Sequence, residues 1–134
     1  MKRLISVILV LAVVLSLCTT VFADYQLYDI GGVTEQSYLY ISGTTATCTS
    51  SSSFSTSNVS FVKITQSLEK QGFLWTWGKY AGDWTKTLTK SGNLTTTAYD
   101  LSSGNYRVKS VFVITLKDGT SQTITLYSAE KTVP

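Results

Sequence analysis

The fold class is decided by YRVKSVFVITL (residues 106–116), the turn KDG (117–119) and TSQTITL (120–126). Apolar side chains alternate along both segments, which places them on one face of each strand; they are Tyr106, Val108, Phe112, Ile114, Ile124 and Leu126. A two-residue loop would pair Val113 with Ile124, whereas a three-residue loop with Gly119 in a left-handed conformation pairs Phe112 with Ile124. Only the three-residue loop joins both apolar faces, so we predict that register.

The rest of the sequence extends this pattern to an all-β domain. Ser and Thr make up roughly a third of the residues after position 23, aromatic and β-branched residues are frequent, and the single proline is the last residue. Turn signals recur about every 8–12 residues, which is typical of an antiparallel β-sandwich of 7–8 strands. A strand is predicted over 59–70. The Ser-rich stretch before it, 50–58, is predicted to be an exposed loop whose Phe54 tucks against the end of the sandwich.

The first 23 residues, Met1–Ala23, have the pattern of a secretory signal peptide, which is expected to form a helix before removal. Basic Lys2 and Arg3 precede a run of about 14 apolar residues, too short for a membrane span, and small side chains flank a cleavage site after Ala23. We therefore expect a secreted, extracellular protein with no membrane span after cleavage. The alternative is a lipoprotein anchored through Cys18, which Leu17 disfavours because the motif requires a small residue there.

Three parts follow from this interpretation: the signal peptide at 1–23, a flexible leader arm at 24–37 interrupted by Gly31-Gly32, and a β-sandwich domain at 38–134. Without the signal peptide nine basic residues face eight acidic ones, a net charge of about +1. The basic residues are scattered, so no nucleic-acid partner is predicted.

Chemistry-bearing residues are scarce. The sequence has no histidine, which removes the commonest general base and transition-metal ligand, and no cofactor is expected. Cys48 would be the only cysteine of the mature chain. It alternates with threonines, so we expect a buried thiol in a strand; the alternative is an exposed thiol that pairs between chains.

Leu101-Ser102-Ser103-Gly104-Asn105-Tyr106-Arg107-Val108-Lys109 resembles the entry to the penultimate strand of fibronectin-III-like and immunoglobulin-like sandwiches. The resemblance implies that Gly104 forms a tight turn and that Tyr106 is the tyrosine corner, whose hydroxyl ties a loop to the strand. Val108 stands where immunoglobulin domains have a cysteine. The segment from Tyr38 to Thr132 also resembles small exported β-sandwich proteins of Gram-positive, clostridia-like bacteria, a group without assigned biochemistry.

Two catalytic patterns are present only as weak matches. Ser60–Lys63, Ser67–Lys70 and Ser128–Lys131 fit the S-x-x-K motif, but that motif works on a helix, and positions i and i+3 of a strand point to opposite faces. Acidic side chains such as Asp83 and Asp118 suit turns, and no spacing suggests a catalytic pair. We expect no enzyme activity.

An aromatic cluster is the best candidate for a binding site. Phe73, Trp75 and Trp77 alternate and would share one strand face, and Tyr80 and Trp84 flank the expected turn at 81–83. We expect one of Trp75 and Trp77 to be buried and one nearby aromatic residue to be at least half exposed. Core packing is the competing interpretation of this cluster.

The function that these observations predict is a secreted, non-enzymatic binding or surface-associated module. Trp75, Trp77, Tyr80 and Trp84 are its candidate contact residues, and an extracellular glycan, the cell wall or a protein is the expected partner. The alternative is a secreted antagonist, either a bacteriocin-like toxin or an inhibitor.

Overall fold

The computed structural model describes residues 25–30 and 32–134, so the predicted signal peptide and its helix lie outside the described residues. Within them the chain forms β-strands, one short 3-10 turn and no α-helix. The elements are β1 (Tyr25–Ile30), β2 (Val33–Ser42), β3 (Thr45–Ser53), β4 (Val59–Gln71), η1 (Phe73–Trp75), β5 (Trp77–Leu88), β6 (Gly92–Ala98), β7 (Gly104–Leu116), β8 (Ser121–Tyr127) and β9 (Lys131–Val133).

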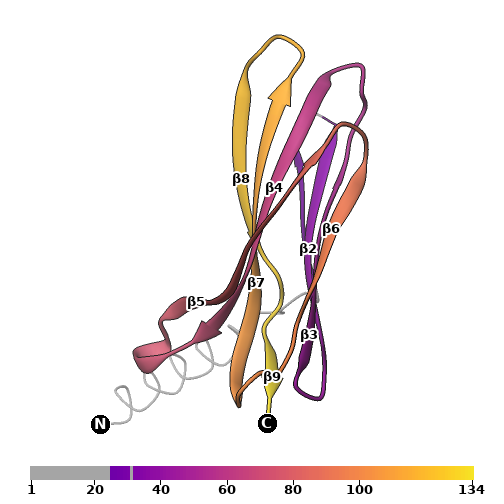
Figure 1. Cartoon of the computed structure of the whole chain (residues 1–134). Coiled ribbons are helices and arrows are strands. Elements are labelled where there is room, and N and C mark those ends of the chain that lie inside the picture. The colour runs from indigo at the N-terminus through magenta and orange to yellow at the C-terminus, as the bar shows by residue number, and fades with distance from the viewer. Residues whose placement is uncertain (1–24, 31) are drawn as a thin grey trace, which may run out of the picture.

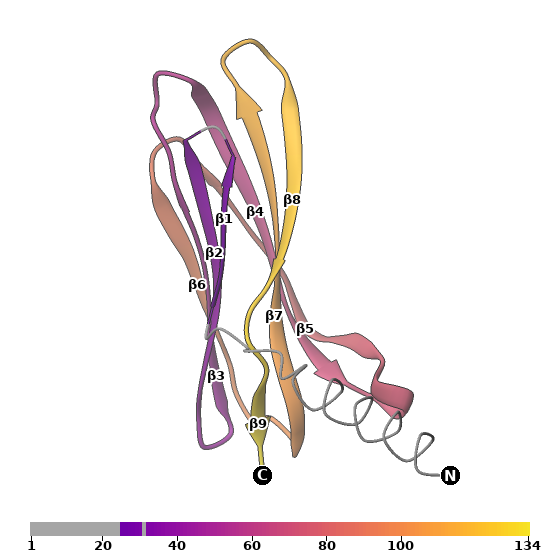
Figure 2. The same cartoon turned by 180° about the vertical axis from the view of Figure 1, so that it is seen from behind.

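The strands form two antiparallel sheets that face each other as a sandwich (Figures 1 and 2). One sheet has the order β1-β2-β3-β6, and the other has the order β5-β4-β7-β8 with β9 paired to the start of β7. The β7–β8 turn lies at one end of the sandwich (Figure 1). The tip of the β4–β5 hairpin projects at the other end, where β9 lies. The all-β, antiparallel prediction is confirmed.

The β7–β8 hairpin has the predicted register, with Phe112 opposite Ile124. Gly119 has a φ of +89° and its N–H donates to the carbonyl of Leu116 at 3.0 Å. The loop is therefore the three-residue turn 117–119, and Phe112 and Ile124 are both buried.

The segment predicted as a flexible leader arm is in strands instead. Tyr25–Ile30 and Val33–Ser42 pair with each other around the break at residues 31–32, with Ile30 opposite Val33. Val33 is buried against the core, so β2 begins five residues before the predicted domain boundary at Tyr38. The alternation of apolar residues in this segment is too short to predict a strand. The strand forms because β2 pairs with β1 and β3.

The Ser-rich stretch 50–58 is also not simply a loop. Residues 50–53 complete β3, and Ser50 and Ser52 are buried. Phe54 is buried at the end of the sandwich, as predicted. Serine in this strand alternates between core and surface, a period-2 pattern hidden because both faces carry the same residue type.

The core consists of two apolar clusters. One contains Val33, Phe54, Val59, Val62, Ile64, Leu88, Phe112, Ile114, Ile124 and Leu126. The other contains Leu39, Ala46, Cys48, Leu68, Ala98, Leu101, Tyr106, Val108 and Val133. Each side of the sandwich contributes to both clusters, so burial of these side chains holds the two sheets together.

A layer of hydrogen-bonded polar side chains separates the two clusters; we call Ser37, Ser50, Gln66, Thr96 and Ser110 the polar layer. The amide of Gln66 donates to Ser50 Oγ at 2.6 Å and to the carbonyl of Leu94 at 3.2 Å. The hydroxyl of Thr96 donates to Gln66 Oε1. Ser110 Oγ lies 2.8 Å from Ser37 Oγ. These contacts supply the partners that buried polar groups require.

Strand β5 carries two irregularities. Its pairing with β4 shifts between Gln66 and Ser67 and again between Leu68 and Glu69, which leaves Asp83 and Tyr80 as extra residues. The turn predicted at 81–83 is therefore wrong, because β5 continues through these residues. Bulges and turns share the same glycine and aspartate signals.

Candidate functional site

The tip of the β4–β5 hairpin is a tight turn of unusual composition. Leu74 and Trp75 both have positive φ values, 54° and 59°, and the N–H of Thr76 donates to the carbonyl of Phe73 at 3.3 Å. This is the arrangement of a type I′ turn, whose central positions normally hold Asn and Gly. Left-handed backbone at two successive large residues is strained, and such strain is concentrated at functional sites.

Hydrogen bonds hold this tip in place. The side chain of Thr76 donates to the carbonyl of Phe73 at 2.7 Å, and the N–H of Gly72 donates to the carbonyl of Thr76 at 2.7 Å. Phe73, Leu74 and Trp75 remain 85%, 69% and 77% exposed. The hairpin therefore presents three large apolar side chains to solvent on an ordered backbone.

The expected alternation of Phe73, Trp75 and Trp77 on one strand face is wrong, because the chain reverses direction between the first and the last of them. The expectation that Trp75 or Trp77 is buried is also wrong: Trp75 is exposed and Trp77 is only partly buried. We also expected at least one aromatic residue here to be half exposed, and this is confirmed by both Phe73 and Trp75.

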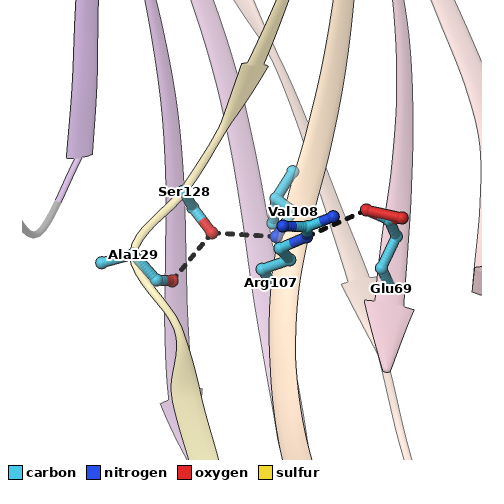
Figure 3. Close-up of polar contacts among 5 residues, drawn as sticks. All are labelled: Glu69, Arg107, Val108, Ser128 and Ala129. Atoms are coloured by element: carbon cyan, nitrogen blue, oxygen red, sulfur yellow. Dashed lines mark hydrogen bonds and ion pairs between the residues drawn. The ribbon is translucent and has the colours of Figure 1, made fainter. Parts of the chain in front are cut away.

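Trp77 belongs to a stacked group on the outer face of its sheet. The guanidinium of Arg107 lies 4.3 Å from the centre of the Trp77 ring and 4.0 Å from that of Tyr127. Arg107 Nε also donates to Glu69 Oε1 at 3.0 Å, and this contact joins β7 to β4 (Figure 3). Arg107 is thus held between two rings and a carboxylate.

Tyr80 and Trp84 lie beside the apolar core cluster that contains Cys48 and Tyr106. The Tyr80 ring packs edge-to-face on Tyr106 with centroids 5.3 Å apart, and Lys70 Nζ lies 5.9 Å from the Tyr80 ring centre. Trp84 is partly buried against the cluster that contains Leu68 and Cys48. The four predicted contact residues therefore do not form one surface: Trp75 is at the tip, Trp77 is stacked, Tyr80 contacts Tyr106 but remains 40% exposed, and Trp84 packs against the core.

The sequence-based prediction missed Leu74, Arg107, Glu69 and Tyr127. Leu74 was read as a strand residue, and a turn without Asn, Gly or Pro at its centre gives no local signal. Arg107 and Glu69 are adjacent only through the register of β4 with β7, where they are paired. Long-range register of this kind cannot be read from local periodicity.

The contact predicted for Tyr106 is present, whereas Gly104, which was expected in a tight turn, is the first residue of β7. The buried hydroxyl of Tyr106 donates to the carbonyl of Ser102 at 2.6 Å and so ties the preceding loop to β7. Gly104 has a φ of +146°, and a Cβ there would lie 2.6 Å from Lys70 Cε. A side chain at position 104 would therefore be strained and would displace Lys70.

Cys48 is fully buried, as predicted. Burial raises the pKa of its thiol to about 12. A hydrogen bond with Thr96 has a smaller, opposite effect and lowers this pKa. The thiolate is the reactive form, so this cysteine is a core residue and not a nucleophile in the folded state.

One serine of the S-x-x-K matches, Ser128, has structural contacts. Ser128 Oγ accepts from the N–H of Val108 at 2.8 Å and donates to the carbonyl of Ala129 at 3.0 Å (Figure 3). Ser128 thereby continues the pairing to β7 where β8 ends. Lys70 donates to Ser102 Oγ at 2.6 Å rather than to Ser67.

The carboxylates are likewise engaged singly. Asp118 accepts from the Thr120 N–H at 2.8 Å and the Thr120 hydroxyl at 2.6 Å, and these bonds lower the pKa of Asp118. Asp83 pairs with Lys79 at the surface. Within residues 25–30 and 32–134, no group of three or more His, Cys, Asp or Glu is arranged to hold a metal ion.

Two hollows open on the surface. One, of about 430 Å³, lies at the β7–β8 end, and its lining includes Val33, Asn58, Ile114, Leu116 and Gln122. The other, of about 420 Å³, lies between the hairpin tip and the start of β7, beside Gly104 and Asn105. The second hollow adjoins the exposed apolar residues, which makes the tip and its surroundings the candidate site.

Comparison with known proteins gives no match to a family model, a curated protein or a solved structure. None of the helical segments among the described residues is long and apolar enough to cross a membrane.

Proposed function

We propose that this chain is a secreted, non-enzymatic binding module that contacts its partner through the tip of the β4–β5 hairpin. The observation that carries the proposal is the exposure of Phe73, Leu74 and Trp75 on a turn held by three hydrogen bonds. Contiguous exposed apolar groups of this size mark interaction sites on soluble domains.

Secretion is part of the same proposal. The pattern of residues 1–23 supports export, and a fold whose described residues contain one buried thiol and no disulfide does not depend on oxidation outside the cell. Cleavage after Ala23 would release a chain that still contains all the described strands, since the first begins at Tyr25.

We also propose that the sandwich is of the fibronectin-III-like type. The hydrogen bond from Tyr106 to Ser102 supports this type, because it is the tyrosine-corner contact at the entry to the penultimate long strand. The connections support it too: β4–β5 and β7–β8 are hairpins within one sheet, whereas the chain changes sheets between β3 and β4 and between β5 and β6.

The test is retention on cell-envelope material. Purified protein would be incubated with cell-wall glycan, membranes and extracellular protein fractions, and wild type compared with Phe73→Ala/Trp75→Ala. Tyr40→Ala is the matched control, because Tyr40 is an exposed aromatic residue on the opposite sheet. We expect the tip variant alone to lose retention while its unfolding midpoint stays unchanged. Equal retention of all three proteins on every fraction contradicts the proposal.

A further inference from the structure

The hairpin tip combines a projecting shape with an almost wholly apolar surface. Phe73, Leu74 and Trp75 are its exposed side chains, and the tip of the β4–β5 hairpin projects sideways, away from the neighbouring strands (Figures 1 and 2). The neighbouring polar side chain, Thr76, donates its hydroxyl to the Phe73 carbonyl. A sugar ligand needs several hydrogen-bonding groups beside the stacking ring, and the side chains of the tip offer the indole N–H of Trp75 and the committed hydroxyl of Thr76.

The size of the tip argues against a large protein interface. Fully buried aromatic side chains contribute about 150–250 Å² each, so Phe73 and Trp75 together with the smaller Leu74 offer on the order of 500 Å². A stable protein–protein interface takes about 800 Å² from each partner. A small, convex apolar surface of this area is better suited to insert into a lipid surface than to form a stable interface with a folded protein.

The backbone at the base of the tip is hydrogen-bonded within the turn, which lowers part of the cost of a water-poor environment. The N–H groups of Gly72 and Thr76 and the carbonyls of Phe73 and Thr76 form hydrogen bonds within the turn. Unsatisfied backbone groups are costly in the apolar part of a bilayer, so internal bonding is a requirement for insertion.

The charges beside the tip are favourable for phospholipid headgroups. Lys70 and Lys79 bracket the segment, and no acidic residue lies between them in the sequence. Glu69 accepts from Arg107. Lys79 pairs with Asp83 in an exposed ion pair, and Lys70 donates to Ser102, so each lysine would exchange a surface partner for a phosphate. Juxtaposed lysines add attraction to phosphate, and tryptophan and phenylalanine are the residues typical of the interfacial region.

We propose that the tip inserts Phe73, Leu74 and Trp75 into the surface of a phospholipid bilayer, with Lys70 and Lys79 at the level of the phosphates. This inference rests on the proposed binding function and names its partner. Insertion is shallow, reaching the headgroup and upper acyl region as amphipathic anchors do.

The test uses vesicles made of equal parts phosphatidylcholine and phosphatidylglycerol, with every variant expressed from the full sequence and purified in the processed form of the wild type. Co-sedimentation would be compared for wild type, Phe73→Ala/Trp75→Ala and the control Tyr40→Ala. We expect the tip variant to partition about 100-fold more weakly, since two aromatic side chains leave the interface, and the control to match wild type. Equal partitioning of wild type and tip variant, or no sedimentation of wild type, overturns the inference.

Tryptophan emission separates insertion from an indirect effect. The wild-type emission should move to shorter wavelength on these vesicles, and Trp75→Phe should keep vesicle binding but lose the shift. Lys79→Gln should weaken partitioning about fivefold, whereas Lys117→Gln in the β7–β8 turn should not. An unchanged emission on vesicles overturns the inference. Tip-dependent retention on cell-wall glycan or protein without vesicle binding also overturns it, but leaves the proposed binding function standing.

Discussion

The hydroxyl of Ser110 lies 2.6 Å from the hydroxyl of Ser50, across the two sheets and in the middle of the core. On β7, Ser110 stands between Phe112 of one apolar cluster and Val108 of the other. Ser110 is therefore the junction of the polar layer, on the core-facing side of β7.

Replacing Ser110 by alanine should destabilise the fold by about 1–3 kcal/mol, because Ser37 and Ser50 lose a buried partner. Urea unfolding followed by circular dichroism measures the change. Ser51→Ala is the matched control, since Ser51 adjoins Ser50 on the opposite face of β3, and its effect should stay within about 0.5 kcal/mol. Equal effects at both positions would count against an energetic role for the polar layer.

Tyr106→Phe should cost about 1–2 kcal/mol in the free energy of unfolding. The ring keeps its packing, but the carbonyl of Ser102 loses its hydroxyl donor. Tyr99→Phe provides the control, because Tyr99 is exposed. A difference between the two variants of less than about 0.3 kcal/mol would show that the loop is not held by this bond.

Arg107→Lys should loosen the outer face of the β5-β4-β7-β8 sheet. Lysine lacks the planar group that stacks between Trp77 and Tyr127 and donates to Glu69. We expect a loss of about 1 kcal/mol and a red shift of tryptophan emission as Trp77 becomes more exposed. Lys109→Arg, on the same face of β7, should leave both readouts unchanged; emission identical to wild type in Arg107→Lys refutes the stacking role.

Replacing Leu74-Trp75 by Asn-Gly should raise stability while it abolishes tip-dependent retention. Asn and Gly adopt positive φ readily, so the variant releases strain of about 1 kcal/mol or more, and it also removes two exposed apolar side chains. Thermal unfolding and envelope retention measure the two effects separately. A variant that melts below wild type would show that these residues serve the fold rather than a partner.

Cys48 should resist thiol reagents in the folded protein at pH 8 and react fully in urea. Burial raises the folded-state pKa of Cys48 from its ordinary 9.0 to about 12. Below pH 9 the thiol is neutral in both states and its contribution to stability is constant. Between pH 9 and 12 the unfolded state loses the proton first, so stability should fall as pH rises. Rapid labelling of folded protein at pH 8 contradicts the buried assignment.

The sequence determined the parts of this fold in which apolar and polar residues alternate clearly. The pairing of Phe112 with Ile124 followed from alternation and one glycine, and the burial of Cys48 followed from its threonine neighbours. Both depend on contacts that are local in sequence or on simple burial.

Other features could not be read in this way. Ser50 and Ser51 have the same side chain on opposite faces of β3, so composition hid the strand. Leu74 and Trp75 adopt a turn that their residue types disfavour, and alternation therefore predicted a continuous strand. The stacking of Trp77 on Arg107 depends on the pairing of β4 with both its neighbours, which is a property of the sheet as a whole.

The irregular course of β5 has one more consequence. β5 is the outermost strand of its sheet, and a straight outer strand offers unpaired amides to any passing chain. Here Tyr80 and Asp83 interrupt the regular spacing, and Gly82 lies so close to β4 that an added Cβ would be 2.7 Å from Ser67 Cα. The backbone N–H and C=O groups of an incoming strand would fail to align with those of β5 at both Tyr80 and Asp83. The edge that carries the exposed apolar tip is therefore a poor template for the addition of a further strand.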